Sequence, residues 1–334
     1  MTEIMNRWKV CIRCSTYNHS LYVAETLDGF VSQRTDFPFV AVIVDDASTD
    51  GEQQVLMNYL SNHFEKCELS SEYDREDDEA VICFARHKVN RNCYFSVVLL
   101  KSNHDSKKQS KHCYYSSWQN DSKYVALCEG DDYWIDSNKL QQQVNFLEAN
   151  LAYSMCFHNA KFNYETESRL RQIIVEDRDY TAVEAFNAWI IPTASILAIN
   201  SVFKNSIEDK RIINSDIWYV LSATSLGKIR GMSSYMSVYR IHSNGLTIRR
   251  QKENMLLLQY KYVDHYKSLF TNFPQITHNC YSSKMCDVYM NIGVIYLRRR
   301  NIVYGLYYLI KSIIFSPRQF INRINQYFKR NEAI

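Results

Sequence analysis

The 334-residue sequence predicts an α/β protein with a mostly parallel central sheet flanked by helices. Two runs of strand length, residues 9–14 and 39–44, are separated by a helical pattern, which is the order of a βαβ unit. The second run is apolar throughout, as in strands covered on both faces. A third run, residues 124–128, leads directly into acidic residues and then into another helix. These observations predict a right-handed crossover and a parallel sheet.

The remaining elements follow in a regular order. We expect Ser20 to cap the first helix, whose apolar residues Val23, Leu27 and Phe30 follow helical spacing. The helix after Gly51 has its own apolar stripe. Further strands are expected over residues 96–100, 153–157, 194–199 and 234–241, and further helices over residues 112–119, from 137 and over 216–222.

Two regions depart from this alternation. Residues 65–95 begin with a run of acids and show no convincing period, so we expect a surface insertion. Beyond Arg250 the pattern is helical to the end. We therefore expect a catalytic domain over residues 1–250 and a helical C-terminal extension over residues 251–334.

The charge distribution separates the body of the chain from its end. The net charge is +3, but residues 296–334 contain eight Lys or Arg and one acid, a balance of +7. The rest therefore carries about −4 (+3 minus +7), which argues against a nucleic-acid-binding body and for a basic tail. The first residues lack the apolar run of a secretory signal, so we expect a cytoplasmic protein.

Ten cysteines in such a protein are expected to be free thiols. Cys11 and Cys14 form a C-x-x-C pair on a predicted strand, where residues three apart point to opposite faces. Because the sequence has no second C-x-x-C pair, we interpret these cysteines as small apolar core residues rather than as a zinc site.

Acidic residues follow two of the predicted strands directly. Asp46 comes after the second strand, and the pair Asp131 and Asp132 comes after the strand over residues 124–128. Ligands of open α/β sheets bind beyond the carboxyl ends of the strands, so these acids should face one crevice. Helix capping does not explain two adjacent carboxylates, which repel unless a cation or a donor offsets them. Mg²⁺ and Mn²⁺ take such oxygen ligands, although an exposed acidic turn remains the alternative.

Three motifs in this order, CSTYN, VDDASTDG and YVALCEGDDYWIDSNKLQQQVNFLE, resemble the family 2 glycosyltransferases of the GT-A fold, of the type that builds bacterial surface polysaccharides. The resemblance covers residues 9–247, and the insertion over residues 65–95 matches poorly. It implies a transferase that uses Mn²⁺ or Mg²⁺ and a nucleotide-sugar donor, by default a UDP-sugar. It also implies a glycan or lipid-linked saccharide acceptor.

The resemblance assigns roles to individual residues. Ser15 and Tyr17 would line the nucleotide pocket, and Asp46 would accept a hydrogen bond from the base. Asp131 would approach the ribose or the phosphates, and Asp132 would ligate the metal. The sequence departs from the family pattern at Glu129, which stands in place of the first aspartate of the usual D-x-D motif.

Two further segments complete the implied site. Asp216, in N-S-D-I-W, would be the general base that deprotonates the acceptor hydroxyl, and a single displacement would invert the anomeric configuration. The alternative role for Asp216 is helix capping. If residues 234–241 form a strand, Arg240 and His242 lie on one face. Arg240 would then bind the diphosphate and His242 would complete the metal shell, or serve a structural role.

The basic C-terminal tail predicts an amphipathic helix. Pro317 can begin this helix, and its apolar stripe would be flanked by arginines and lysines. The stripe consists of Phe320, Ile321, Ile324, Tyr327 and Phe328. Such a helix could lie on the anionic inner surface of the cell membrane, or it could pack on the catalytic domain.

Two other functions are compatible with parts of the pattern. A nucleotidyltransferase also combines an α/β nucleotide site with metal-binding acids, but it usually begins with a glycine-rich phosphate loop, which this sequence lacks. A catalytically inactive sugar-nucleotide or glycan-binding module is the other alternative. Loss of Asp132 or Asp216 would favour it, and both residues are present.

Overall fold

The computed structural model describes residues 7–165, 174–204, 207–245 and 254–331, with side chains up to residue 326. The chain forms two compact units. The first comprises residues 1–180, 190–206 and 226–242, and the second comprises residues 181–189, 207–225 and 243–334. The boundary expected near Arg250 falls outside the described residues.

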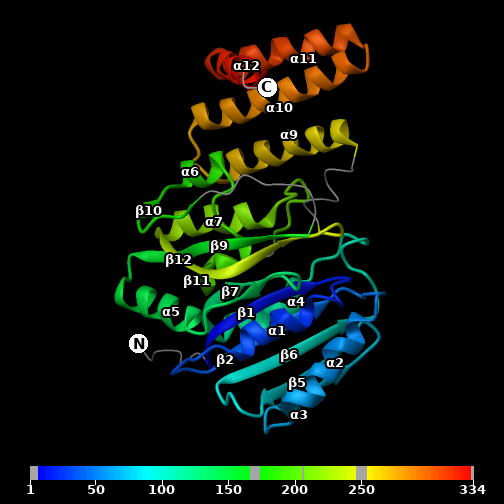
Figure 1. Ribbon diagram of the computed structural model, residues 1–334, viewed down its shortest axis with the longest axis vertical. Helices are drawn as coiled ribbons and strands as arrows, with labels where there is room; N and C mark the ends of the chain where they lie inside the picture. The colour runs from blue at the N-terminus through cyan, green and yellow to red at the C-terminus, as the bar shows by residue number, and fades with distance from the viewer. Residues whose placement is uncertain (1–6, 166–173, 205–206, 246–253, 332–334) are drawn as a thin grey trace. The chain divides into compact units, whose positions relative to one another are not determined.

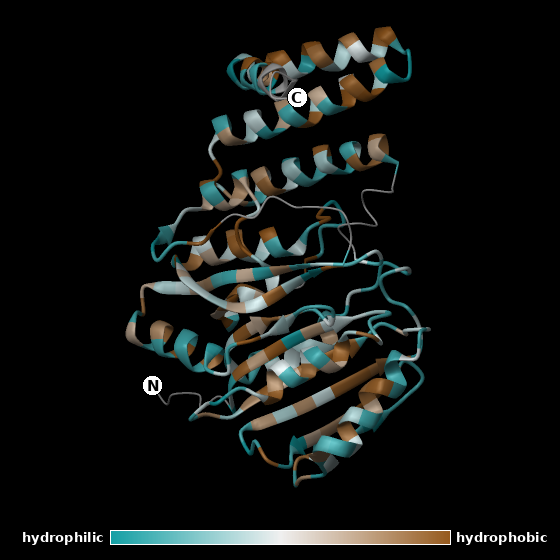
Figure 2. Cartoon of the chain, in the orientation of Figure 1, coloured by the Kyte–Doolittle hydropathy of each residue, from teal (hydrophilic) through white to brown (hydrophobic). Residues whose placement is uncertain are grey.

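Four parallel strands form the centre of the sheet in the first unit (Figure 1). Their order is β7 (Ser122–Leu127), β1 (Trp8–Thr16), β2 (Phe39–Asp45) and β6 (Cys93–Leu100). Ile12 pairs with Ala41 on one side and with Ala126 on the other. β2 is buried along its whole length, and Figure 2 shows the brown, apolar residues of β6 beside it. The α/β fold with a mostly parallel central sheet is confirmed.

The sheet continues beyond β7 with strands of mixed direction. β11 (Leu197–Ile199) is antiparallel to β7 and to β9 (Tyr153–Tyr164), while β12 (Lys228–Ile241) runs parallel to β9. The two-residue strand β10 (Asp179–Tyr180) ends this side of the sheet. β8 (Tyr133–Trp134) pairs with β12 and thereby brings the acidic turn before it alongside the end of β12.

Helices cover both faces of this sheet. α1 (Val23–Val31), α2 (Glu52–His63) and α5 (Lys139–Ala149) share one apolar core with inward residues of β1 and β2, such as Ile12 and Ile43. α4 (His112–Asn120) covers the other face, where Trp118 lies against Trp8. Cys14 belongs to the first core and Cys11 does not, as expected for opposite faces of a strand, and both are free thiols.

The start of α1 differs from the expectation. The helix begins at Val23 with Tyr22 as N-cap, and no side chain caps it. Ser20 lies two residues before this N-cap, and its backbone N–H donates to the Asp50 carboxylate at 2.9 Å. This hydrogen bond ties the turn that follows β1 to the turn that follows β2.

The segment expected as an irregular insertion is part of the sheet. It contains the short elements β3 (Phe64–Glu65), α3 (Ser70–Tyr73) and β4 (Arg75–Glu76). Next comes β5 (Ala80–His87), which pairs antiparallel with β6. The acids lie in β3, α3, β4 and the turns between them, whereas Ala80 and Phe84 of β5 are buried. The acid-rich composition of this segment conceals the strand that follows, whose buried residues are spaced too irregularly for a clear period.

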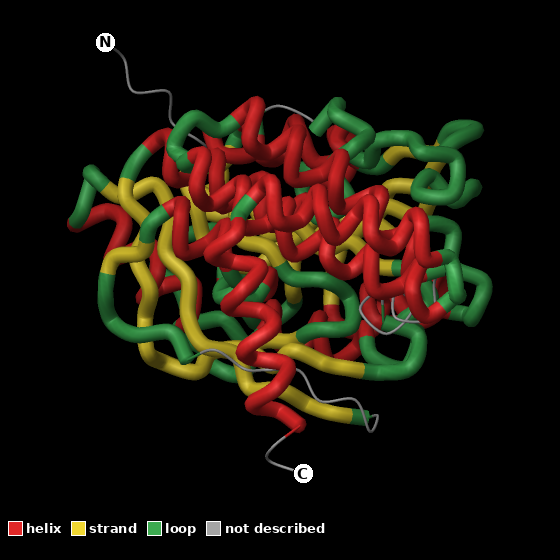
Figure 3. The backbone as a smooth tube through the Cα atoms, turned by 90° about the horizontal axis from the view of Figure 1, so that it is seen from above, coloured by secondary structure: helices red, strands yellow, loops and turns green. Residues whose placement is uncertain are grey.

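The second unit is helical. It contains α6 (Ala182–Asn187), α7 (Ser215–Leu226), α9 (Met255–Asn272), α10 (His278–Arg298), α11 (Ile302–Phe315) and α12 (Pro317–Asn331). Phe186 and Leu221 pack with Leu269 and Phe273, so α6 and α7 belong with the C-terminal helices rather than with the sheet. Figure 3 shows the helices as red tubes. Within the described residues, no helix is both long and apolar enough to cross a membrane.

Candidate metal and donor site

The segments that follow β1, β2 and β7 meet at the carboxyl edge of the sheet. The Asp46 backbone N–H donates to the Thr16 carbonyl at 3.0 Å, and the Gly130 N–H donates to the Ser15 carbonyl at 3.0 Å. Since β1, β2 and β7 are parallel, the polar turns at their ends share one edge, as open α/β sheets require of a ligand site.

Three side chains converge there into a group that can hold a metal ion. His242 Nε2 lies 3.0 Å and His19 Nε2 lies 3.6 Å from Asp131 Oδ2. The candidate ligand atoms of all three residues lie within 4.8 Å of one another. Within the described part of the chain, no second group of three or more histidine, cysteine or acidic side chains has ligand atoms this close together. The sequence predicts Asp131 and His242 at the site, but it does not predict His19.

His19 is held by a second layer of hydrogen bonds. Its Nδ1 lies 3.1 Å from Thr16 Oγ1, which in turn donates to the Glu52 carboxylate. The His19 backbone N–H and the Ser48 hydroxyl donate to the other oxygen of Glu52, at 2.9 and 2.8 Å. Outer hydrogen bonds of this kind fix the ring orientation of metal-binding histidines.

Burial sets the protonation of this layer. It raises the pKa of the Glu52 carboxyl to about 7, in spite of the three groups that donate to it. It also lowers the pKa of His19, against the opposing charge of Asp131. The neutral imidazole is the form that binds a metal, so His19 is ready to ligate at neutral pH.

Gly130 allows the acidic turn to lie directly on Thr16. A Cβ atom at position 130 would stand 2.0 Å from Thr16 Oγ1 and 2.5 Å from Thr16 Cβ. No side chain fits in this space. The glycine in E-G-D-D therefore brings Asp131 close to the end of β1.

Asp132 lies outside the metal-ligand group, which differs from its predicted role. Its side chain is buried, and Oδ1 accepts the Arg240 backbone N–H at 2.9 Å. Burial, followed by the charges of Asp131 and Glu129, raises the pKa of Asp132 well above its usual range. The side chains of Asp131 and Asp132 thus have different partners. Asp131 contacts the His242 ring, whereas Asp132 contacts the backbone of β12, with which β8 pairs immediately afterwards. Asp131, and not Asp132, belongs to the group of three side chains, and the metal role predicted for Asp132 stays a prediction.

The surroundings of Asp131 favour the charged form of its carboxyl. Burial raises the pKa of this carboxyl, but the hydrogen bond with His242 and the proximity of His19 outweigh burial, and the pKa lies below its usual value. One oxygen of this carboxylate faces the Nε2 atoms of both imidazoles, and the three side chains together could hold a metal ion.

Arg240 joins the site from β12, as its alternation with His242 predicts. Its guanidinium donates to the Asp131 carbonyl and pairs with Glu25 and, at 3.4 Å, with Glu165. It also lies over the Tyr22 ring at 4.5 Å. The structure thus shows Arg240 holding the acidic turn, and diphosphate binding by this residue stays a prediction.

Asp46 is buried beneath the loop that follows β6. Its carboxylate accepts the His104 and Asp105 backbone N–H groups at 2.7 and 3.1 Å and the Lys111 ammonium at 2.9 Å. Burial raises the pKa of Asp46, but these donors outweigh it and leave the pKa below the usual value. These donors occupy three of the roughly four acceptor positions of a carboxylate, and binding of a base by Asp46 stays a prediction.

The other predicted residues lie in two places. Ser15 is partly exposed near the end of β1, with Oγ 2.8 Å from Tyr115 Oη, and Tyr17 is partly exposed just beyond the strand. Asp216 belongs to the second unit, on the first turn of α7, where Oδ1 accepts the Ile217 backbone N–H at 2.9 Å. Its role as a base stays a prediction.

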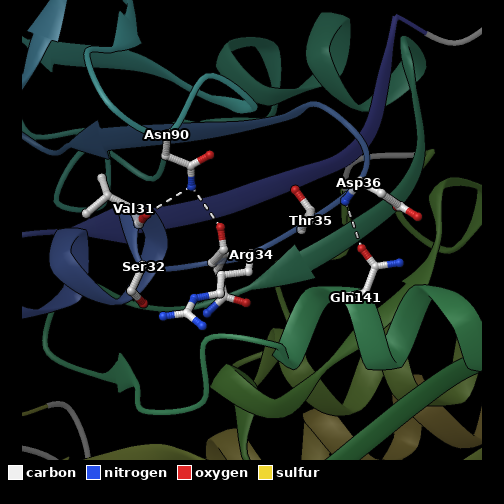
Figure 4. Close-up of a pocket in the computed structure, with 8 residues that line it drawn as sticks. Val31, Ser32, Arg34, Thr35, Asp36, Asn90 and Gln141 are labelled. Carbon is white, nitrogen blue, oxygen red and sulfur yellow. Dashed lines mark hydrogen bonds between the residues drawn. The ribbon is translucent and has the colours of Figure 1, made fainter.

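An open pocket lies at the opposite edge of the strands (Figure 4). It is lined by residues 31–36, Asn90 and Gln141. Asn90 Nδ2 donates to the Val31 and Gln33 carbonyls at 2.9 and 2.7 Å, and the Asp36 N–H donates to Gln141 at 2.9 Å. Because these polar groups bind one another at the amino ends of the strands, we place the functional site at the carboxyl edge.

The comparisons with known proteins give relatives of unassigned function. No protein-family model matches the chain. Uncharacterized proteins of Mycobacterium bovis and Mycobacterium tuberculosis are 27% identical over 243 residues. The match covers 69% of this chain and only 58% of each of those proteins.

Solved structures resemble the chain over most of its length. A mannosyltransferase from Pyrobaculum calidifontis in complex with GDP-Man and Mn²⁺ is 11% identical, with a TM-score of 0.54, and the match covers 92% of this chain and 86% of that one. Residues 1–349 of S. aureus TarS in complex with UDP-GlcNAc are 14% identical, with a TM-score of 0.50 and 90% of each chain covered. The chain has the fold of these proteins. The expected GT-A class, with C-terminal helices, is therefore confirmed.

Proposed function

We propose that the protein is an inverting, metal-dependent glycosyltransferase that moves a sugar from a nucleotide-diphosphate donor, by default a UDP-sugar, to a glycan or lipid-linked saccharide. We place its work on the cytoplasmic side of the membrane, in the synthesis of a surface polysaccharide. The observation that carries the proposal is the group of His19, Asp131 and His242 at the carboxyl edge of a sheet of this fold. The motifs of the resemblance converge on that edge.

The ligands favour Mn²⁺ over Mg²⁺. The group offers two imidazole nitrogens and one carboxylate oxygen. Mg²⁺ prefers oxygen ligands and keeps several waters, and the mannosyltransferase that shares the fold was solved in complex with Mn²⁺. When bound, the ion would neutralise negative charge on the diphosphate leaving group.

The protein's own side chains bind the donor and accept the proton of the acceptor hydroxyl. We propose that Asp46 takes a base N–H on its remaining acceptor position and that Ser15 and Tyr17 line the nucleotide pocket. Asp216 accepts the proton of the acceptor hydroxyl while that oxygen attacks the anomeric carbon and the bond to the diphosphate breaks. Arg240 keeps Asp131 in place, and Asp132 holds β12 beside the acidic turn.

A thermal-shift panel tests the donor site. UDP, GDP, dTDP and CMP are each added with and without Mn²⁺, because a ligand that binds only the native state raises the melting temperature. We expect one nucleotide diphosphate to raise the melting temperature, and to do so only in the presence of Mn²⁺. The matching nucleotide-sugars are then offered with candidate acceptors, and the anomeric configuration of the product is read by NMR. The absence of a shift with every nucleotide would overturn the proposal in favour of an inactive binding module.

A further inference from the structure

The outward face of α11 is apolar and exposed. Its buried residues, Gly305 and Ser312, lie on one side of the helix. Val303, Ile310 and Ile314 lie on the opposite side, at spacings of seven and four residues, and are 78%, 56% and 73% exposed. The face also includes Ile302, Tyr304, Leu306, Tyr307 and Ile313, each at least 40% exposed. Isolated exposed apolar residues are ordinary, but a continuous face of this kind marks an interaction site.

Contacts with α10 show why this face is the one left outward. A Cβ on Gly305 would stand 2.5 Å from Leu297 Cδ2 and 3.3 Å from the Gly293 carbonyl, so the two helices approach closely at their glycines. Ser312 Oγ donates to the Cys286 carbonyl at 2.8 Å. The small residues of α11 therefore pack on α10, and the large apolar ones point away. Figure 2 shows brown residues recurring along α11.

Basic residues flank this helix along the chain and interrupt it once. Arg298, Arg299 and Arg300 lie exposed just before α11, Lys311 lies within it, and Arg318 follows it. Residues 288–331 contain no aspartate or glutamate. A second copy of the chain on this face would bring two basic rims together, whereas an anionic surface complements them.

The basic tail helix α12 is less free to contact a membrane than its sequence indicates, because it packs on α10. On α12, Gln319 Nε2 lies 3.0 Å and Arg323 Nε lies 3.3 Å from Asp287 Oδ1 on α10. Phe320 and Ile324 of the expected stripe are half-buried, and Ile321 is exposed. The side chains of Tyr327 and Phe328 lie outside the described residues. The exposed apolar surface is thus on α11 rather than on α12.

We propose that the outward face of α11 docks on the surface of an anionic phospholipid membrane. The 14-residue helix, about 21 Å long, would lie in the plane of the interface. Its apolar residues would enter the headgroup region and the surrounding arginines would meet lipid phosphates. Membrane binding by this surface does not require glycosyl transfer, so it can be tested independently of the proposed activity.

Vesicle flotation of the full chain tests the proposal. The lipids are phosphatidylcholine alone and phosphatidylcholine with a minority of phosphatidylglycerol. We expect binding to the anionic vesicles that weakens as salt is raised. The variant Ile310→Glu/Ile314→Glu should reduce partitioning by about tenfold or more for each substitution, since each removes the burial of one isoleucine. Arg298→Gln/Arg299→Gln/Arg300→Gln should reduce binding to the anionic vesicles by about fivefold for each charge removed.

The matched control is Val89→Glu/Leu151→Glu, which changes two apolar residues of the first unit that are 84% and 85% exposed. It should bind vesicles as the wild type does. Circular dichroism and melting curves identify variants that fail to fold. Equal binding by the α11 variant and the control would overturn the proposal. So would a wild-type chain that ignores vesicles and forms a dimer that Ile310→Glu/Ile314→Glu dissociates, which would assign the face to a second copy.

Discussion

His242 Nε2 lies 3.0 Å from Asp131 Oδ2, although 111 residues separate the two along the chain. The pairing of β8 with β12 produces this contact, because Trp134 lies opposite Ser237 and the acidic turn just before β8 then reaches the end of β12. His19 arrives from the end of β1. Three distant segments thus supply one group of ligand atoms.

Asp131→Asn and Asp132→Asn should separate the roles of the adjacent acids. We expect Asp131→Asn to abolish the Mn²⁺-dependent thermal shift, because it removes a carboxylate oxygen shared by two imidazoles. Asp132→Asn should keep that shift, since an amide oxygen can still accept the Arg240 N–H. The two variants are compared by titrating Mn²⁺ in the presence of the active nucleotide. The reverse result would return the metal to Asp132, as the sequence predicts.

Thr16→Val should weaken metal binding from outside the ligand group. The substitution removes the hydroxyl that links His19 Nδ1 to Glu52 while keeping a similar shape. Loss of such an outer partner typically costs about 10- to 100-fold in metal affinity. Isothermal titration with Mn²⁺ measures the effect. Thr35→Val, whose hydroxyl donates to the Phe37 carbonyl at 2.7 Å at the opposite edge of the strands, is the control and should bind as the wild type does. Equal affinities in all three proteins would contradict a supporting role for Thr16.

Asp216→Asn should separate binding from chemistry. The amide oxygen can still accept the Ile217 N–H, so α7 should keep its first turn. We expect kcat to fall by about 10²- to 10⁴-fold while the donor dissociation constant stays the same, as for loss of a general base. Ser215→Ala, at the preceding position, should leave kcat nearly unchanged. A variant of Asp216 that retains full activity would identify this residue as part of the helix end only.

Lys139→Met should change how stability depends on pH. Lys139 is fully buried, with Nζ 2.8 Å from Gln143 Oε1, and burial lowers its pKa to about 7. The unfolded chain, with a pKa near 10.5, binds a proton between about pH 7 and 10.5 that the native state does not bind. The wild-type free energy of unfolding therefore gains up to about 1.4 kcal/mol per pH unit from this group across that window.

The stability of the methionine variant does not depend on the titration of residue 139. Near pH 7 the wild type has not yet gained the stability that deprotonation of Lys139 gives at higher pH, so the variant should be the more stable protein there. Urea unfolding at several pH values measures the difference between the two proteins, which should shrink as pH rises. The buried thiols of Cys128 and Cys156, whose pKa values burial raises, are present in both proteins. Parallel stability curves for the two proteins would show that Lys139 stays protonated in the native state.

The sequence predicts those parts of the site that depend on local order. Asp46 and Asp131 follow strands directly, and parallel strands must place their ends at one edge. His19 was not predicted because its role depends on β1 and β12 converging on the same turn, which no local pattern encodes. The choice between Asp131 and Asp132 depends on side-chain directions in an irregular turn, where strand alternation does not apply.

Two other features depend on packing rather than on composition. The outward face of α11 follows from the glycines that place its other side on α10. α6 and α7 fall within the expected catalytic domain along the chain, but Phe186 and Leu221 pack with apolar residues of α9. A boundary drawn along the sequence cannot represent a unit assembled from separate segments.

The acid-rich segment before β5 covers the side of that strand that faces away from β6. Without it, β5 would present a row of free backbone N–H and C=O groups, to which another chain could add a strand. β3 and β4 cover parts of that row, and Arg91 and Lys101 pair there with Glu65 and Glu76. At the other end of the described sheet, β10 is only two residues long. Deleting residues 66–76 should therefore promote aggregation through β5, even though the deletion lies outside the proposed catalytic machinery.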